Sequence, residues 1–175
     1  MAFGELTIVT GEKGAGKTTY VRHLAADRVG RGHTVGGVIS VAVFEHGHRV
    51  GYDLLDARTG DCRPLARVVD LSRERATIGQ FKFFPEAVTA GNAAIMAATR
   101  DGMGLVVIDE VGPLEFRGGG WAPALEVAIA EGTKTQGLVV VVRPALIEKL
   151  PQRFGNADWA GATRVTAPWP TTAAG

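Results

Sequence analysis

The fold and the chemistry of this chain are decided by the stretch Gly11-Glu12-Lys13-Gly14-Ala15-Gly16-Lys17-Thr18. It matches the pattern G-x-x-x-x-G-K-[ST], whose glycines let successive backbone N–H groups approach phosphate oxygens. In this pattern Lys17 supplies a positive charge to the β and γ phosphates, and the Thr18 hydroxyl can ligate Mg²⁺. We therefore predict that these eight residues, called the phosphate loop below, bind a nucleotide together with Thr19.

The flanking sequence supplies the strand and the helix that such a loop needs. Leu6 to Thr10 is a short apolar run that ends at Gly11, as expected of a buried strand. After the loop, apolar residues recur at helical spacing until Gly30-Arg31-Gly32 ends the pattern. The start of a helix directs its N–H groups and the positive end of its dipole at the same anion. This context favours a working phosphate loop over a chance match in a glycine-rich chain.

Further along the chain, short apolar runs alternate with helical stretches, which indicates an α/β fold with a mainly parallel sheet. Strands are expected at 35–43, 48–56, 81–84, 105–108, 138–142 and 164–166, and helices at 85–100, 123–131 and from Pro144. His46-Gly47 is typical of a tight turn, so the first two of these strands are predicted to form an inserted antiparallel hairpin. The stretch 62–77 fits neither pattern. We expect three layers in one domain, 1–166, and a loose segment at 167–175.

Two carboxylates follow the buried strand 105–108. In proteins with a phosphate loop such a strand lies beside the loop, and the aspartate at its end orients Mg²⁺ through bound water. We therefore expect Asp109 to hold the metal ion together with Thr18. Glu110 then faces the γ-phosphate and can polarise an attacking water, which makes it the predicted general base.

Three weaker features admit two interpretations each. Arg143 follows strand 138–142 and either neutralises charge on the γ-phosphate, as a catalytic residue beside Lys17, or is a solvated arginine at a strand end. The glycines 118–120 form either a mobile flap over the nucleotide or a surface loop. A third set either stacks on a base or belongs to the core, the commoner case: Tyr52, Phe81 and Phe84.

Composition and charge exclude several classes of protein. The chain has 175 residues, 46% of them hydrophobic, which excludes a wholly disordered chain, and its net charge of +1 argues against nucleic-acid binding. Cys62 is a single cysteine and cannot form an internal disulfide. No apolar run reaches the roughly 18 residues of a membrane span. We expect a cytoplasmic protein without membrane or nucleic-acid partners, and the four histidines lack zinc-ligand spacing.

The chain resembles the small nucleoside-triphosphatase family first described from thermophiles, which also has a human cancer-related member. Four segments carry the resemblance in order, across about residues 7–144: GEKGAGKTTY, GVISVAVFEHGHRVGYDLLDARTG, VVIDEVGPLEF and GLVVVVRP. The first is common to many phosphate-loop proteins. The hairpin with Gly51-Tyr52-Asp53, and the Asp-Glu-Val-Gly-x-x-Glu arrangement that begins at Asp109, are more specific to this family.

The resemblance implies a P-loop NTPase fold and a Mg²⁺-dependent hydrolase that accepts ATP, GTP and other NTPs and releases NDP and phosphate. It implies that residues 11–18 bind the phosphates and that Asp109 with Glu110 forms the hydrolytic pair. The chain departs from the family at Pro113, where some members carry a lysine. It also departs at Ala167-Pro168, where members often have Asn and Arg near the base. Base recognition is therefore the feature of the family that the resemblance supports least for this chain.

Two other functions remain open. A kinase for a nucleotide or small metabolite uses the same loop but normally closes an arginine-rich lid, and the candidate lid, 111–120, contains only Arg117. A nucleotide-dependent switch or assembly factor uses the same parts with slow hydrolysis and an unidentified protein partner. Thr133-Lys134-Thr135-Gln136 lacks the aspartate of the guanine-reading N-K-x-D motif. The hairpin 35–56 is a place for base contacts or for a partner, by analogy with the fold.

Overall fold

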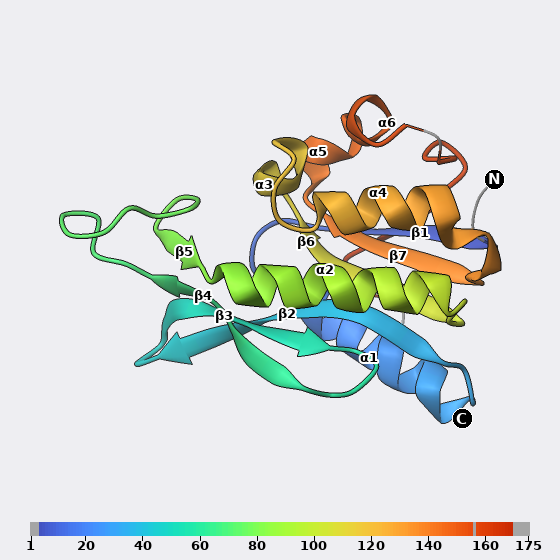
Figure 1. The fold of residues 1–175 in the computed structure, drawn as a ribbon, viewed down its shortest axis with the longest axis horizontal. Coiled ribbons are helices and arrows are strands. Elements are labelled where there is room, and N and C mark those ends of the chain that lie inside the picture. Colours follow the sequence, from blue (N-terminus) through green and yellow to red (C-terminus); the bar gives the residue numbers. More distant parts are fainter. Residues whose placement is uncertain (1–3, 156, 170–175) are drawn as a thin grey trace.

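The computed structural model describes residues 4–155 and 157–169, and an eight-stranded sheet lies at its centre (Figure 1). The strand order is β5-β4-β3-β2-β6-β7-β1-β8. The strands are β1 Glu5–Thr10, β2 Val35–Glu45, β3 His48–Asp56, β4 Cys62–Val68, β5 Phe81–Phe83, β6 Leu105–Val111, β7 Gly137–Val142 and β8 Thr163–Thr166. β2, β6, β7, β1 and β8 run parallel, whereas β3, β4 and β5 continue the sheet in antiparallel fashion. The predicted α/β class, with a mainly parallel sheet and an inserted hairpin, is confirmed.

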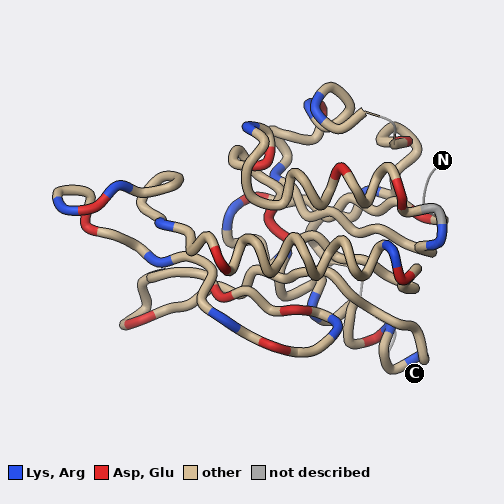
Figure 2. The backbone as a smooth tube through the Cα atoms, viewed as in Figure 1, with Lys and Arg blue, Asp and Glu red and all other residues tan. Residues whose placement is uncertain are grey.

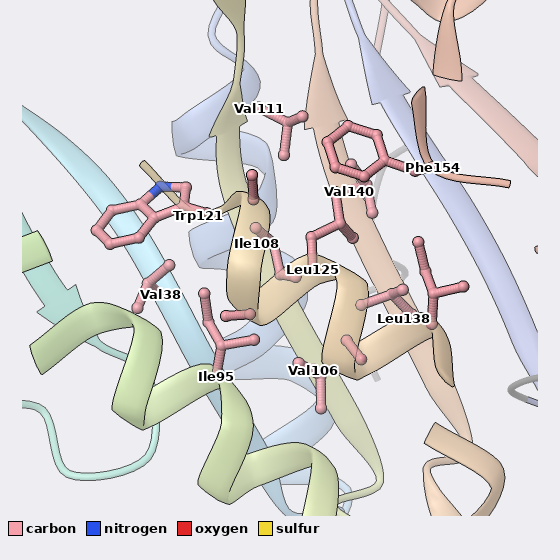
Figure 3. Packing of buried hydrophobic residues seen from close by; sticks show 14 of the residues in the cluster. Val38, Ile95, Val106, Ile108, Val111, Trp121, Leu125, Leu138, Val140 and Phe154 are labelled. Atoms are coloured by element: carbon pink, nitrogen blue, oxygen red, sulfur yellow. The ribbon is translucent and has the colours of Figure 1, made fainter. Parts of the chain in front are cut away.

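Helices cover both faces of the parallel strands, which explains why those strands are apolar throughout. α1 (Lys17–Gly30) packs on one face, and α2 (Pro85–Arg100) and α4 (Ala122–Glu131) pack on the other. Leu138 and Val140 of β7 face α2 and α4, while Val139 and Val141 face α1, as the alternation of side chains in a strand requires. Figure 3 shows the larger core, in which Ile95, Trp121 and Leu125 lie over the sheet.

Short helices close the carboxyl end of the parallel strands. They are α3 (Pro113–Phe116), α5 (Pro144–Ile147) and α6 (Leu150–Arg153), and a single 3₁₀ turn, η1 (Gly132–Lys134), follows α4. Proline occupies the first or second position of α2, α3, α4, α5 and α6, where its missing N–H would be unpaired in any case. These helices place the loops after β6 and β7 beside the phosphate loop.

The antiparallel strands form an arm at one edge of the sheet, and the loop between β4 and β5 extends away from the rest of the molecule (Figure 1). β2 and β3 form the predicted hairpin around His46 and Gly47, which have φ angles of 48° and 79°. The pairing of this hairpin is irregular at one point, because Val43 lies opposite Gly51 but Phe44 lies opposite Arg49. Val50 is therefore an extra residue of β3, a β-bulge.

The expected elements are otherwise found within a few residues of their predicted bounds, and three differences stand out. β4 occupies the first part of the unassigned stretch 62–77, and α3 lies where the sequence predicts no helix. Trp169, within the segment expected to be loose, contacts the phosphate loop. The remainder of that segment, 170–175, lies outside the described residues.

Basic and acidic residues are interspersed along the chain (Figure 2). This mixture agrees with the net charge of +1. Among the described residues, no helix is both long enough and apolar enough to cross a membrane.

Candidate functional site

The phosphate loop joins β1 to α1 at the carboxyl end of the parallel strands, the edge at which α/β proteins bind their ligands. Gly14 and Gly16 have φ angles of 82° and 84°, which a residue with a Cβ adopts only at a cost. Gly16 is the N-cap of α1, and no side chain caps this helix end. The first N–H groups of α1 are thus available to an anion.

Lys17 lies against the loop that contains it. Its ammonium group donates to the carbonyl oxygens of Gly11 (2.7 Å) and Glu12 (2.8 Å), and the residue is 7% exposed. Burial lowers the pKa of Lys17, with Glu110 opposing and Arg143 adding to this effect. The charge effects of Glu110 and Arg143 show that both lie within electrostatic range of the ammonium group.

Asp109 is fully buried beside Thr18. Its Oδ2 accepts hydrogen bonds from the Thr18 hydroxyl (2.9 Å) and from the Ser40 N–H of β2 (3.1 Å). Its Oδ1 is buried without a hydrogen-bond partner among the described residues. Burial raises the pKa of Asp109 to about 7, and the charge of Glu110 adds to this, against the bonds from Ser40 and Thr18. The structure therefore brings the two predicted metal ligands together.

Glu110 lies in a β-bulge of β6. Ile108 pairs with Val140 and Val111 pairs with Val142, so Asp109 and Glu110 together lie opposite one residue of β7. Glu110 has a φ angle of 62°, a conformation rare outside glycine and often found at functional sites. The Trp121 indole N–H donates to the Asp109 carbonyl at 3.1 Å and helps to hold the bulge. The bulge turns Glu110 into the cleft described next.

A cleft of about 340 Å³ lies between the phosphate loop and the β2–β3 hairpin. Its lining includes most of the residues predicted for the site, namely Lys13, Gly14, Gly16, Lys17, Thr18, Thr19, Glu110 and Arg143. The other predicted residues of the loop, Gly11, Glu12 and Ala15, do not line it, and Asp109 lies buried beneath Thr18. Arg22 and Arg49 add two further cations to its walls. A cleft with five cationic side chains and one carboxylate suits a triphosphate.

A mainly apolar cavity of about 120 Å³, whose lining also includes four charged residues, continues from the cleft beyond Glu110 and Arg143. Tyr52 and Phe81 line it, with ring centroids 5.3 Å apart. Phe84 does not line it and packs against the larger core. Two of the three aromatic residues considered for base stacking therefore lie at the site, but on the Glu110 side of the phosphate loop.

Glu115 is a buried residue for which the sequence indicates no role. Its carboxylate accepts the N–H groups of Gly112 (2.8 Å) and Trp121 (3.0 Å), and it is 4% exposed. A Cβ at Gly120 would overlap this carboxylate. Glu115 thus fixes both ends of the segment 112–121. Gly118, Gly119 and Gly120 form a loop between α3 and α4 and do not line the cleft in this structure.

Glu115 is expected to make the free energy of unfolding fall as pH rises. Burial raises its pKa from 4.5 to about 7, against the hydrogen bonds from Trp121 and Gly112. A carboxyl group with a raised folded-state pKa contributes fully below pH 4.5, and its contribution is lost as pH rises through the folded pKa. A pKa shift of this size corresponds to a loss of about 3 kcal/mol in the free energy of unfolding. Glu115→Gln, which does not titrate, should show a flatter stability profile between pH 4.5 and 8 in urea unfolding; parallel profiles would contradict the assignment.

Trp169 contacts the phosphate loop and does not line the cleft. Its indole N–H donates to the Ala15 carbonyl at 2.9 Å, and its ring stacks on Tyr20 of α1 at 5.1 Å between centroids. A Cβ at Gly11 or Gly16 would lie within 3.5 Å of the indole. The sequence contains no signal for this contact, because it joins residues 154 positions apart.

Comparisons with known proteins give matches over most of the chain. A family model described as NTPase matches residues 6–163. The nucleoside-triphosphatase THEP1 of Thermofilum pendens is 37% identical over 123 residues, which are 70% of this chain and 66% of that protein. The protein of the same name from Archaeoglobus fulgidus is 37% identical over 112 residues, 62% of this chain and 61% of that protein. The matches to these two relatives thus cover less than two thirds of their length.

A solved structure shares the fold. It is described as a human cancer-related nucleoside triphosphatase and superimposes with a TM-score of 0.65 at 23% identity. The superposition covers 93% of this chain and 89% of that chain.

Proposed function

Because the chain belongs to the NTPase family, we propose that it is a nucleoside-triphosphatase that hydrolyses NTP to NDP and phosphate. One observation carries the proposal: Lys17 and Thr18 of the phosphate loop, Glu110 and Arg143 line a single cationic cleft. The residues belong to three separate segments of the chain, and the sheet brings them together at one edge. Such an arrangement binds phosphates and also provides a group that accepts a proton.

The residues fit a magnesium ion. Mg²⁺ prefers oxygen ligands and is usually bound by one or two protein groups together with substrate phosphates. Thr18 Oγ1 and Asp109 would hold it, and the unpaired buried Oδ1 of Asp109 supports this assignment. When bound, the ion would neutralise charge on the β and γ phosphates.

The side chains of this chain have separate roles in binding and hydrolysis. The N–H groups of the phosphate loop and of the first turn of α1 bind phosphate oxygens, and Lys17 exchanges its bonds to the Gly11 and Glu12 carbonyls for bonds to the phosphates. Glu110 orients a water and accepts its proton as the water oxygen attacks the γ-phosphorus. Arg143 neutralises negative charge that builds on the γ-phosphoryl oxygens. These contacts concern the phosphates, which supports acceptance of ATP, GTP and other NTPs.

A second candidate function is transfer of the γ-phosphoryl group to an organic hydroxyl. The apolar cavity beyond Glu110 favours it, because its volume of about 120 Å³ is close to that of engineered apolar cavities that bind a benzene ring. Transfer would release NDP without free phosphate. The ratio of the two products therefore distinguishes this function from hydrolysis.

The test of the proposed function is release of phosphate and NDP from ATP, GTP, CTP and UTP, with and without Mg²⁺. We expect equal release of both products from several NTPs, dependence on Mg²⁺, and loss of both in Lys17→Ala. EDTA should abolish turnover. Binding of NTP without phosphate release would contradict hydrolysis by the isolated chain. It would favour a function that needs a phosphoryl acceptor or a partner protein.

A further inference from the structure

We propose that Arg49 of β3 contacts the γ-phosphate and neutralises the charge that develops there during hydrolysis. The hairpin would thus supply a catalytic arginine from within the same chain. The proposal rests on the proposed function and adds to it a residue that no sequence motif indicates. Four observations carry it: the bulge at Val50, the contacts of the guanidinium, its unpaired Nε and its place in the cleft.

The bulge at Val50 determines which face of the hairpin carries Arg49. Side chains alternate along a strand, so in a regular strand Arg49 and Tyr52, three positions apart, would lie on opposite faces. Val50 is an extra residue, and Arg49 therefore pairs with Phe44 while Tyr52 pairs with Ala42. Directly paired residues share a face of the sheet. Arg49, Phe44, Ala42 and Tyr52 accordingly lie on one face, and all four line the cleft.

The guanidinium group is held in place by two aromatic rings. Its central carbon lies 5.4 Å from the Phe44 ring centroid and 5.3 Å from the Tyr52 centroid, within the range of cation–π contacts. Its Nη1 also donates to the Tyr52 hydroxyl at 3.0 Å. A side chain ordered in this way loses little further conformational entropy when it binds a ligand.

One donor of the ordered guanidinium is unsatisfied. Nε of Arg49 is buried and has no hydrogen-bond partner among the described residues. Unpaired buried donors are uncommon in folded proteins, and an ion or ligand that supplies the acceptor is one explanation of such a donor. Phosphate oxygens are the acceptors that best match the fork of an arginine.

The place of Arg49 in the cleft identifies the phosphate that it meets. Glu110 and Arg143 line the same cleft, and the charges of Glu110, Arg49 and Arg143 all act on the Tyr52 hydroxyl. Glu110 marks the side from which water attacks, so Arg49 of β3 and Arg143, which follows β7, approach the terminal phosphate from different segments. In the step itself, the water oxygen bonds to the γ-phosphorus, the bond from that phosphorus to the β–γ bridging oxygen breaks, and Glu110 takes the proton. The electron pair leaves on NDP, and Arg49 stabilises the oxygens of the group in transfer.

The test compares the parent with Arg49→Ala, Arg49→Lys and a control, Arg63→Ala, which changes an exposed arginine of β4. We expect kcat for ATP to fall on the order of 10³-fold in Arg49→Ala, the low end for catalytic arginines, with little change in ADP affinity. Arg49→Lys should recover only a small part of the lost kcat, because lysine lacks the forked guanidinium group. Aluminium fluoride, which mimics the group in transfer, should tighten ADP binding in the parent and in Arg63→Ala but not in Arg49→Ala.

Other results would overturn the proposal. Parent-like kcat in Arg49→Ala excludes it, and so does an equal loss of ADP and ATP affinity, which points to a structural role. If Arg49→Ala does not fold, Tyr52→Phe replaces it: loss of the hydroxyl that orients Arg49 should lower kcat about tenfold without changing ADP affinity. If the parent itself releases no phosphate, the proposed function fails separately. The ratio of ATP to ADP affinity then tests Arg49, since a γ-phosphate contact requires that ratio to fall in Arg49→Ala.

Discussion

Glu110→Gln is expected to lower kcat for NTP hydrolysis by about 10³-fold while KM changes little. Glutamine has the shape of glutamate and fits the same position in the β6 bulge, but it cannot accept a proton from water. The γ-phosphate contacts of Lys17 and of the phosphate loop remain, so binding is retained. Single-turnover phosphate release from ATP, together with ATP affinity by calorimetry, measures the two effects separately.

Two controls make the Glu110 result specific. Glu86→Gln removes an exposed carboxylate at the start of α2 and should leave kcat unchanged. Lys17→Ala should instead lose NTP binding, because it removes the cation of the phosphate loop. Turnover of Glu110→Gln at the parent rate would show that another group accepts the proton.

Gly37→Ala is expected to destabilise the protein by more than about 4 kcal/mol, which places it among the most harmful substitutions. Gly37 has a φ angle of 96°, and a Cβ there would lie 2.1 Å from the Val107 carbonyl oxygen of β6. The contact is with backbone, so no side chain can move to relieve it. β2 and β6 must separate, and Ser40, whose N–H binds Asp109, lies on the same strand. Urea unfolding, or the soluble yield where the variant does not fold, measures the loss.

Gly47→Ala and Gly30→Ala separate steric overlap from backbone strain. Gly47 also has a positive φ, 79°, but a Cβ there meets no described atom within 4 Å, so only the strain of about 1 kcal/mol applies. Gly30 lies at the end of α1 with a negative φ and open space around it, and Gly30→Ala should be neutral or slightly stabilising. A loss for Gly37→Ala no larger than that for Gly47→Ala would show that β2 and β6 can adjust to a side chain.

Much of the fold could be predicted because its signals are local. Apolar runs predict β1, β6 and β7, the repeat of apolar residues predicts α1, and a proline followed by an alanine-rich stretch predicts α2. β4 gives no such signal, because its exposed first half contains Arg63 and Pro64, and pairing with β3 decides its structure. The four-residue helix α3 is also too short for a periodic pattern and depends on Glu115 and Trp121.

The residues of the candidate site also differ in whether a local signal in the sequence predicts them. The phosphate loop, Asp109 and Glu110 follow strands at fixed offsets, so their meeting at one edge follows from a parallel sheet. Ser40 and Trp169 reach the site through contacts between distant segments. Arg49 depends on the register of its hairpin, and Glu115 depends on its contacts with Gly112 and Trp121. A β-bulge leaves no composition signal in a single sequence, and the face occupied by Arg49 is determined only when strand register is known.

The bulge in the hairpin makes the face that Arg49 occupies independent of one residue of chain length, because the extra residue, Val50, is absorbed without a change of face. Deleting Val50 would leave Arg49 two positions from Tyr52, so simple alternation would keep both side chains on the same face, in the cleft. In evolutionary terms, one codon can be gained or lost at this point of the hairpin without removing the arginine from the cleft. Among hairpins of this kind, an arginine two positions before the tyrosine in a regular strand takes the same place as one three positions before it in a bulged strand.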